Sequence, residues 1–332
     1  MTTRFVRRSN RTGAIAASVA ITLSLFGLAG LTSAALHRTG HGQKDPAPVS
    51  YEEDGTTSAF SATASLEGRL EELTYFQAYE GVTYEKEALV YVPPTYTPGV
   101  PANIVYLTHG WWGTADGLAE GVAPIVDQLT SAGAIAPTIV VFATYYPDRT
   151  FATEDYEDDY TLNRFFATTE IDTLIAAVES RYTTYARGDT SDESLRASRR
   201  HRAFGGFSMG ATTTWDVFTL RPQYFYGYMP MAGESWIGRE EDADSAQIAQ
   251  LVTAGAERAH YGPQDFRILA SVGSLDPALA DMAPQLAQLR ADYPDLMTDD
   301  SLQLWIDEGE NHSMTSVGNQ VAHDLPLLFP PA

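Results

Sequence analysis

The chain contains no cysteine among its 332 residues. Disulfide bonds therefore cannot stabilise it, and it cannot carry the acylated cysteine that anchors a lipoprotein. Stability must come from a large core, for which the 44% of hydrophobic and 11% of aromatic residues supply the material. In an exported protein, this lack of cysteine favours a bacterial source. It also favours a large core over a scaffold held together by disulfide bonds.

Basic residues are scarce, and internal repeats and long runs of like charge are missing. The sequence has 21 Lys and Arg against 43 Asp and Glu, a formal net charge of −22. Nucleic acid is excluded as a partner, because binding to phosphates needs a positively charged surface. An anionic membrane surface is excluded for the folded part of the chain on the same ground.

The N-terminal 36 residues differ in composition from the rest of the chain. A basic start precedes an uncharged run over residues 14–36. This pattern predicts a signal peptide or a signal-anchor over residues 1–36, either cleaved near Ala34 or Ala35 or retained in the membrane. We therefore expect a bacterial protein that is secreted or extracytoplasmic, or anchored by residues 14–36. The basic residues are Arg4, Arg7, Arg8 and Arg11.

Residues 37–60 are small and polar, which is typical of a flexible linker. His37 and His41 lie in this segment, and two histidines in a linker do not define a metal site. The folded domain is expected to span residues 61–332, with its first strands close to the start of that range.

Strands and helices alternate along the domain. Two alternating segments, 63–76 and 85–92, predict antiparallel strands at its N-terminal end. The later pattern predicts an α/β fold of the α/β-hydrolase type, with a mostly parallel central sheet and helices on both faces. The later strands are expected at 104–107, 138–143, 202–207, 226–232, 267–272 and 302–306, and the helices at 117–132, 169–185, 244–259 and around residue 323.

A G-x-S-x-G motif runs from Gly206 to Gly210, after an apolar segment and before a helix-compatible one. This context predicts a nucleophile elbow, in which Ser208 lies on a sharp turn between a strand and a helix. Glycines are needed there because no Cβ fits where the strand and the helix cross so closely. The alternative is an ordinary glycine-rich turn.

A serine nucleophile needs a base and an orienting acid, which in this type of fold follow in the order acid and then histidine. Asp276 follows the predicted strand 267–272 and is the preferred acid, with Asp281 and Asp307 as alternatives. His312 follows strand 302–306 and is the preferred base. The other candidate histidines precede strands, lie in the last helix or belong to another loop: His201, His260, His323 and His109.

The loop 108–113 follows an early strand and reads T-H-G-W-W-G. An oxyanion is stabilised by two backbone N–H groups, one from the residue after the nucleophile and one from such a loop. We expect these donors to be Met209 and Trp111, with Trp112 as the neighbouring alternative. A simple turn packed by two tryptophans remains the other interpretation.

These motifs occur together in one order: H-G-W-W-G, G-F-S-M-G, M-P-M-A-G-E-S-W, G-S-L-D and G-E-N-H-S. Over about residues 65–330 the chain resembles the esterase-D-like α/β-hydrolases, and within them the carbohydrate esterases that include feruloyl and acetylxylan esterases. The resemblance implies a catalytic triad of Ser208, Asp276 and His312, with Trp111 and Met209 at the oxyanion hole. The chain departs from the family at Ala211, where glycine is frequent.

The ends of the predicted strands also supply candidate substrate-binding residues. Their aromatic rings suit a phenolic acyl group or a sugar, although such rings also serve as ordinary packing. No basic cluster lies among them, which disfavours an anionic substrate. The acidic run 154–159 is expected to be a solvated loop rather than a metal site. The candidates are His109, Trp112, Tyr145, Tyr146, Glu234 and Trp236.

Together these features predict an exported serine carboxylester hydrolase that acts on small esters or on esterified plant cell-wall polysaccharides, as feruloyl esterases do. The alternatives are an acetylxylan esterase, a mycolyl-type acyltransferase on the same scaffold and a non-enzymatic carbohydrate-binding protein. The chemistry requires no cofactor and no metal.

Overall fold

The computed structural model describes residues 51–52 and 65–331. The predicted signal segment 1–36 therefore lies outside the described residues, as does most of the predicted linker 37–60. Two residues of that linker, Tyr51–Glu52, instead form strand β1, which pairs in parallel with Leu304 and Trp305. This corrects the linker prediction at these two positions, because the neighbouring strand offers free backbone groups there.

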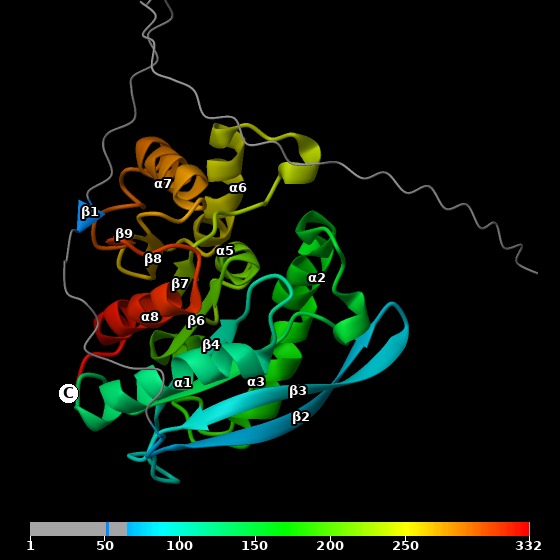
Figure 1. Cartoon of the computed structure of the whole chain (residues 1–332), viewed down its shortest axis with the longest axis vertical. Coiled ribbons are helices and arrows are strands. Elements are labelled where there is room, and N and C mark those ends of the chain that lie inside the picture. Colours follow the sequence, from blue (N-terminus) through cyan, green and yellow to red (C-terminus); the bar gives the residue numbers. More distant parts are fainter. Residues whose placement is uncertain (1–50, 53–64, 332) are drawn as a thin grey trace, which may run out of the picture. The chain divides into compact units, whose positions relative to one another are not determined.

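The described residues form one mixed sheet (Figure 1), with the strand order β1-β9-β8-β7-β6-β4-β5-β3-β2. All neighbours from β5 through β1 pair in parallel, whereas β2, β3 and β5 pair in an antiparallel manner. The prediction of a mostly parallel sheet with antiparallel N-terminal strands is confirmed. The strands are β2 (Arg69–Tyr79), β3 (Val82–Val92), β4 (Asn103–Thr108), β5 (Thr138–Ala143), β6 (Arg202–Phe207), β7 (Gly227–Met231), β8 (Arg267–Gly273) and β9 (Leu302–Asp307).

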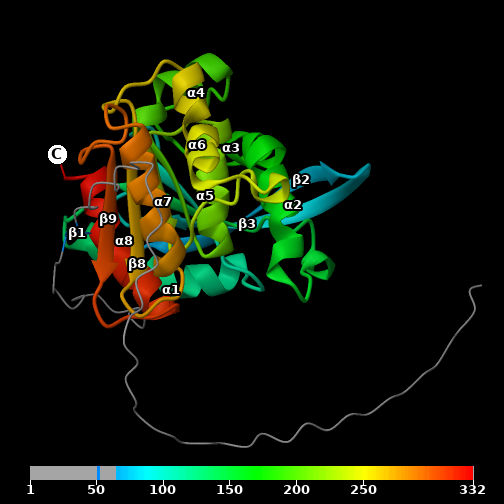
Figure 2. The same cartoon turned by 90° about the horizontal axis from the view of Figure 1, so that it is seen from above.

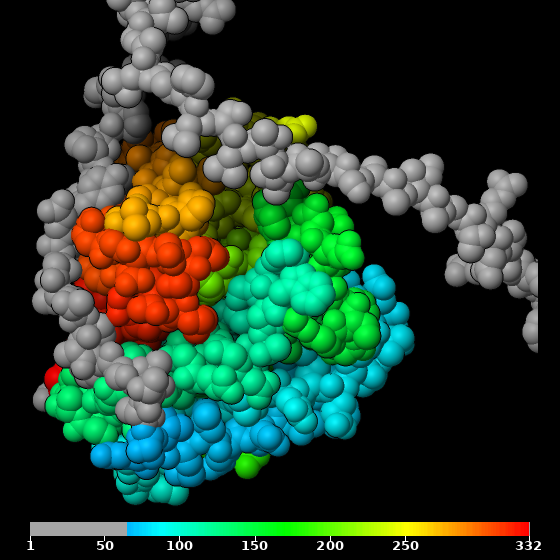
Figure 3. Space-filling view, in the orientation of Figure 1, coloured from blue at the N-terminus to red at the C-terminus, as the bar shows by residue number. Residues whose placement is uncertain are grey.

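Helices cover both faces of the sheet (Figure 2). One apolar cluster packs α1 and α8 on one face, where Figure 3 shows them side by side, and the larger cluster packs the remaining helices on the other. Within residues 51–52 and 65–331, every helix is too short or too polar to cross a bilayer. The helices are α1 (Ala115–Ser131), α2 (Tyr160–Phe165), α3 (Ile171–Glu179), α4 (Asp192–Ala197), α5 (Met209–Leu220), α6 (Ser245–Arg258), α7 (Leu279–Asp292) and α8 (Met314–Leu328).

The helix expected at 169–185 has different bounds in the structure. A helical segment begins with α2, passes through a π-helical turn at Phe166–Glu170 and ends with α3 at Glu179. The prediction was wrong beyond that point, where the chain leaves the helix and Thr184 forms an isolated parallel bridge with Ala102.

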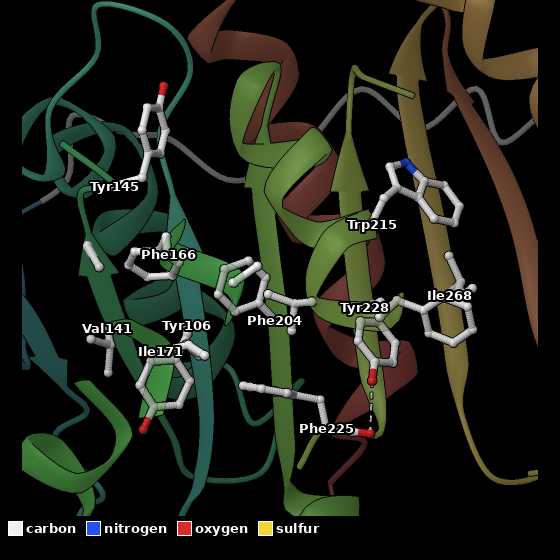
Figure 4. Packing of buried hydrophobic residues seen from close by; sticks show 14 of the residues in the cluster. Tyr106, Val141, Tyr145, Phe166, Ile171, Phe204, Trp215, Phe225, Tyr228 and Ile268 are labelled. Carbon is white, nitrogen blue, oxygen red and sulfur yellow. Dashed lines mark hydrogen bonds between the residues drawn. The ribbon is translucent and has the colours of Figure 1, made fainter. Parts of the chain in front are cut away.

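Large aromatic side chains fill the core beneath the middle of the sheet. The ring of Phe204, in β6, lies 6.1 Å from that of Phe166 and 5.8 Å from that of Phe225, measured between centroids. Figure 4 shows these rings together with Tyr228, whose hydroxyl donates a hydrogen bond to the Phe225 carbonyl. This packing fixes the strand that carries the G-x-S-x-G motif.

The registers align the carboxyl ends of the central strands. Thr108 at the end of β4 pairs with Ala143 of β5 and with Gly206 of β6. At this edge β6 and α5 cross so closely that a Cβ on Gly206 would lie 2.5 Å from the Gly210 carbonyl oxygen. A Cβ on Gly210 would overlap the backbone of Thr108. The expected steric need for glycine at both positions is confirmed.

We expect Gly210→Ala to lower the free energy of unfolding by about 3 kcal/mol, because the added methyl group meets a fixed backbone rather than a movable side chain. Chemical denaturation of the purified protein measures this change.

The matched control is Gly318→Ala within α8, where the nearest atom to an added Cβ is 3.7 Å away on Ile125. That substitution should be neutral or stabilising by up to about 1 kcal/mol, since alanine favours helix. Equal effects of the two substitutions would contradict the tight crossing.

Candidate active site

Ser208 lies on the turn between β6 and α5, at φ 58° and ψ −116°. A positive φ is strained for any residue with a side chain, and such strain is characteristic of functional sites. The turn is held by a hydrogen bond of 2.9 Å from the Ser208 amide to the carbonyl of Met231 in β7. Ser208 is the N-cap of α5 but makes no side-chain capping bond, so its hydroxyl is not used to hold the helix.

His312 and Asp276 meet on the loops that follow β9 and β8. The Nδ1 atom of His312 lies 2.9 Å from one carboxylate oxygen of Asp276 and 3.1 Å from the other. Asp276 is buried, whereas the imidazole is 39% exposed. A carboxylate at Nδ1 favours the tautomer with its proton on that atom, which leaves Nε2 able to accept another proton.

Of the three candidate acids, Asp276, Asp281 and Asp307, the structure places Asp276 against His312. Asp307 ends β9 and accepts hydrogen bonds of 3.0 Å from Ser316 and from Asn319, which ties it to α8. Asp281 lies in the first turn of α7, on the rim of the cavity described next. Asp276 is the carboxylate that contacts His312.

A cavity of about 410 Å³ opens at Ser208. It brings together the predicted nucleophile, base and acid with four more of the predicted residues. Tyr156 and Thr212 also line it, and no motif of the sequence predicted either residue. The Tyr156 ring lies 5.9 Å from that of Trp111 and 5.6 Å from that of Trp236, so three aromatic side chains form one wall. The predicted residues present are Trp111, Ser208, Met209, Glu234, Trp236, Asp276 and His312.

The prediction was wrong for the remaining candidate substrate-binding residues, which do not line this cavity. His109, Tyr145 and Tyr146 are each at most 2% exposed and pack on one another in the core. Trp112 is exposed but turns away: its indole donates a hydrogen bond of 2.8 Å to the carbonyl of Thr153.

The loop 108–113 forms a tight turn, in which the amides of Trp111 and Trp112 differ in their hydrogen bonding. The Gly113 amide donates to the Gly110 carbonyl over 2.9 Å, and Trp112 has a φ of 56°. The amide of Trp112 donates to the hydroxyl of Tyr146. The amide of Trp111 has no such partner among residues 65–331, which makes Trp111 the better candidate.

His109 links this turn to Thr144, the residue that follows β5. Its Nδ1 lies 2.8 Å from the Gly110 carbonyl oxygen, and its Nε2 lies 2.8 Å from the hydroxyl of Thr144. Burial lowers the pKa of His109 to about 4, so the ring is neutral at pH 7. A neutral ring can donate from Nδ1 to Gly110 while Nε2 accepts from Thr144. His109 is therefore a positioning residue for the loop.

The acidic run 154–159 is a solvated loop at most of its positions, but not at Asp159. That side chain is buried and accepts hydrogen bonds from Tyr146 over 2.7 Å and from Thr153 over 2.8 Å. It thereby fixes the tyrosine that holds the Trp112 amide. Among the described residues, no group of three or more His, Asp or Glu side chains could hold a metal ion.

The low pKa of His109 predicts a pH-dependent contribution to stability. The unfolded histidine takes up a proton near pH 6.5, whereas the folded one takes it up near pH 4. The unfolded state therefore binds more protons between these values, and stability is lost as the pH falls through this window. The stability difference between wild type and His109→Gln should shrink by about 2 kcal/mol from pH 7.5 to 4.5.

Urea unfolding of both proteins at the two pH values measures this difference. Comparing the two proteins cancels other titrations common to both, such as that of buried Asp216, whose pKa burial raises to about 7. A difference that stays constant over this range would contradict a neutral buried imidazole.

Comparison with known proteins agrees with this geometry. The family model Esterase ("Putative esterase") matches residues 82–319. Endo-1,4-beta-xylanase Y of Acetivibrio thermocellus is 29% identical over 260 residues, which are 76% of this chain and 23% of the xylanase. The chain thus spans about a quarter of that relative.

Solved structures share the fold. A serine-to-alanine mutant of the feruloyl esterase module from Clostridium thermocellum, complexed with sinapinate, is 28% identical with a TM-score of 0.66, covering 79% of this chain and 88% of the module. A ferulic acid esterase from Anaeromyces mucronatus is 17% identical with a TM-score of 0.61, covering 82% and 94%, and shows the fold alone. The family match extends over more than half of the sequence, and the chain belongs to the esterase family.

Proposed function

We propose that this protein is a serine carboxylester hydrolase of the feruloyl esterase kind, which removes phenolic acyl groups from plant cell-wall polysaccharides. The observation that carries the proposal is the meeting of Ser208, the His312–Asp276 pair and the N-terminus of α5 at one cavity. A serine, an oriented base and a helix N-terminus are the parts that acyl transfer through a covalent intermediate requires.

The reaction follows from these positions. The Ser208 oxygen attacks the ester carbonyl while Nε2 of His312 takes its proton, and Asp276 stabilises the imidazolium that forms. The oxyanion receives hydrogen bonds from the amides of Met209 and Trp111, and the positive end of α5 favours its charge. The alcohol leaves with the proton from His312. Water then repeats the sequence on the acyl-enzyme and releases the acid.

The walls of the cavity support a phenolic acyl group. Trp111, Tyr156 and Trp236 supply flat apolar surface on which an aromatic ring can stack. The feruloyl esterase module with sinapinate, a phenolic acid, is 28% identical to this chain. An acetyl group would leave most of a 410 Å³ cavity unfilled.

We also propose that the enzyme is bacterial and acts outside the cytoplasm. The N-terminal sequence supports export, with its arginine-rich start and the uncharged run 14–36. The substrate supports it as well, because an intact cell-wall polysaccharide is too large to enter a cell before it is shortened.

Ser208→Ala should lower kcat on methyl ferulate by several orders of magnitude, because the covalent step needs the hydroxyl. Wild type should hydrolyse methyl ferulate with a higher kcat/KM than p-nitrophenyl acetate or acetylated xylan. Release of ferulate and acetate, measured by chromatography, tests both statements.

The control is Ser180→Ala, an exposed serine at the end of α3, which should retain full activity. Activity that survives in Ser208→Ala would refute the mechanism. Wild-type activity on acetyl esters alone would identify a deacetylase instead.

Fractionation of producing cells, followed by mass spectrometry, tests export. We expect the protein outside the cytoplasm, either without residues 1–36 or in the membrane fraction with residues 14–36 retained. Full-length protein confined to the cytoplasm would contradict this proposal.

A further inference from the structure

A second cavity, of about 580 Å³, adjoins the catalytic cavity. It lies between the loop after β7, the start of α6 and the first turns of α7. The two cavities share three lining residues, Glu234, Trp236 and Asp281. A ligand bound at Ser208 can therefore extend past this common wall into the second cavity.

The common wall is held in place on several sides. The indole of Trp236 donates a hydrogen bond of 2.6 Å to the Glu234 carboxylate. The guanidinium of Arg239 lies 4.2 Å from the centre of its ring, and Tyr160 packs against it. With 9% of its surface exposed, Trp236 is a fixed divider between the cavities rather than a mobile side chain.

The two cavities differ in the chemistry of their walls. Aromatic rings dominate around Ser208, whereas carboxylate, hydroxyl and amide groups dominate in the second cavity. Such groups exchange hydrogen bonds with the hydroxyl groups of a sugar, while Trp236 and Ile248 offer apolar surface to the face of its ring. The polar residues are Glu234, Ser235, Asp242, Ser245, Asp281 and Gln285, of which Gln285 already bonds through both polar atoms of its side chain to the backbone of Ser235.

The charge of this cavity selects against anions. It contains one basic side chain, Arg239, which already pairs with Glu157 at 2.5 Å. Glu234, Asp242 and Asp281 then leave an excess of negative charge, which repels an acidic ligand and accepts hydrogen bonds from hydroxyl groups.

We infer that the second cavity is a sugar-binding subsite, which holds neutral sugar residues of the alcohol part of the ester while the acyl group occupies the catalytic cavity. This inference rests on the proposed esterase function and deepens it: the enzyme recognises an acylated oligosaccharide rather than a phenolic ester alone. Contacts with the sugar that strengthen in the transition state raise kcat/KM for that substrate.

Ala280→Trp tests the subsite, because Ala280 is exposed in the first turn of α7 and lines the second cavity only. The added indole should lower kcat/KM for a feruloylated xylo-oligosaccharide by about tenfold, because the sugar loses about one hydrogen bond to a charged group. The kcat/KM for methyl ferulate should stay unchanged. Ala291→Trp, also exposed on α7 but three turns further on, is the matched control and should change neither.

Equal loss on both esters, or no loss on either, would overturn the subsite. So would a wild-type enzyme that does not prefer the sugar ester over methyl ferulate.

A binding experiment separates this inference from the proposed function. Isothermal titration with unesterified xylotetraose, on Ser208→Ala with and without Ala280→Trp, needs no catalysis. Binding of xylotetraose to Ser208→Ala that is lost when Ala280→Trp is added supports the subsite. If the wild type nevertheless cleaves none of the esters, the esterase proposal alone fails. No binding to Ser208→Ala would refute the subsite for xylan-type sugars.

Discussion

The close crossing of β6 and α5 at Ser208 is the constraint on which the site depends. Gly206 and Gly210 allow the two backbones to approach, and Ser208 accepts a strained conformation between them. The loop after β7 closes on the same point, since a Cβ on Gly233 would lie 2.7 Å from the Ser208 carbonyl oxygen. The turn therefore sets the position of the nucleophile, the first free amides of α5 and the wall that carries Trp236.

Buried charges hold the strands around this crossing. Arg202, at the start of β6, forms two hydrogen bonds with the Glu179 carboxylate, of 2.5 and 2.8 Å. Lys86, in β3, pairs with Glu170 and donates a hydrogen bond to the carbonyl of Thr144, the residue after β5. The hydroxyl of Thr144 in turn bonds to His109. An isolated buried charge costs several kcal/mol, so these groups disfavour any arrangement that separates them. The loop 108–113 is thus tied, through His109 and Thr144, to the interior of the sheet.

The sequence predicted the parts of this structure that local rules determine. Strand periodicity, the glycine spacing and the order of serine, acid and histidine identified the sheet and the residues that meet at the cavity. It did not predict which way a side chain points after a strand ends. Tyr145 and Tyr146 follow β5 at the correct edge, yet both turn into the core, because buried Asp159 holds the Tyr146 hydroxyl from a loop that the chain reaches later. Tyr156 enters the cavity from that same loop, and no local motif marks it.

In the function that we propose, the two adjoining cavities divide the recognition of an ester between its acyl and its alcohol parts. An aromatic wall gains free energy from removing a ring from water, but it distinguishes poorly between alcohols. A polar cavity discriminates more strongly, because its groups lose their partners when a ligand lacks the matching hydroxyls. Trp236 lies between the two environments, and its indole donates a hydrogen bond to Glu234, which lines both cavities. The neutral polysaccharide that we propose as the substrate is not repelled by the negative charge of the chain.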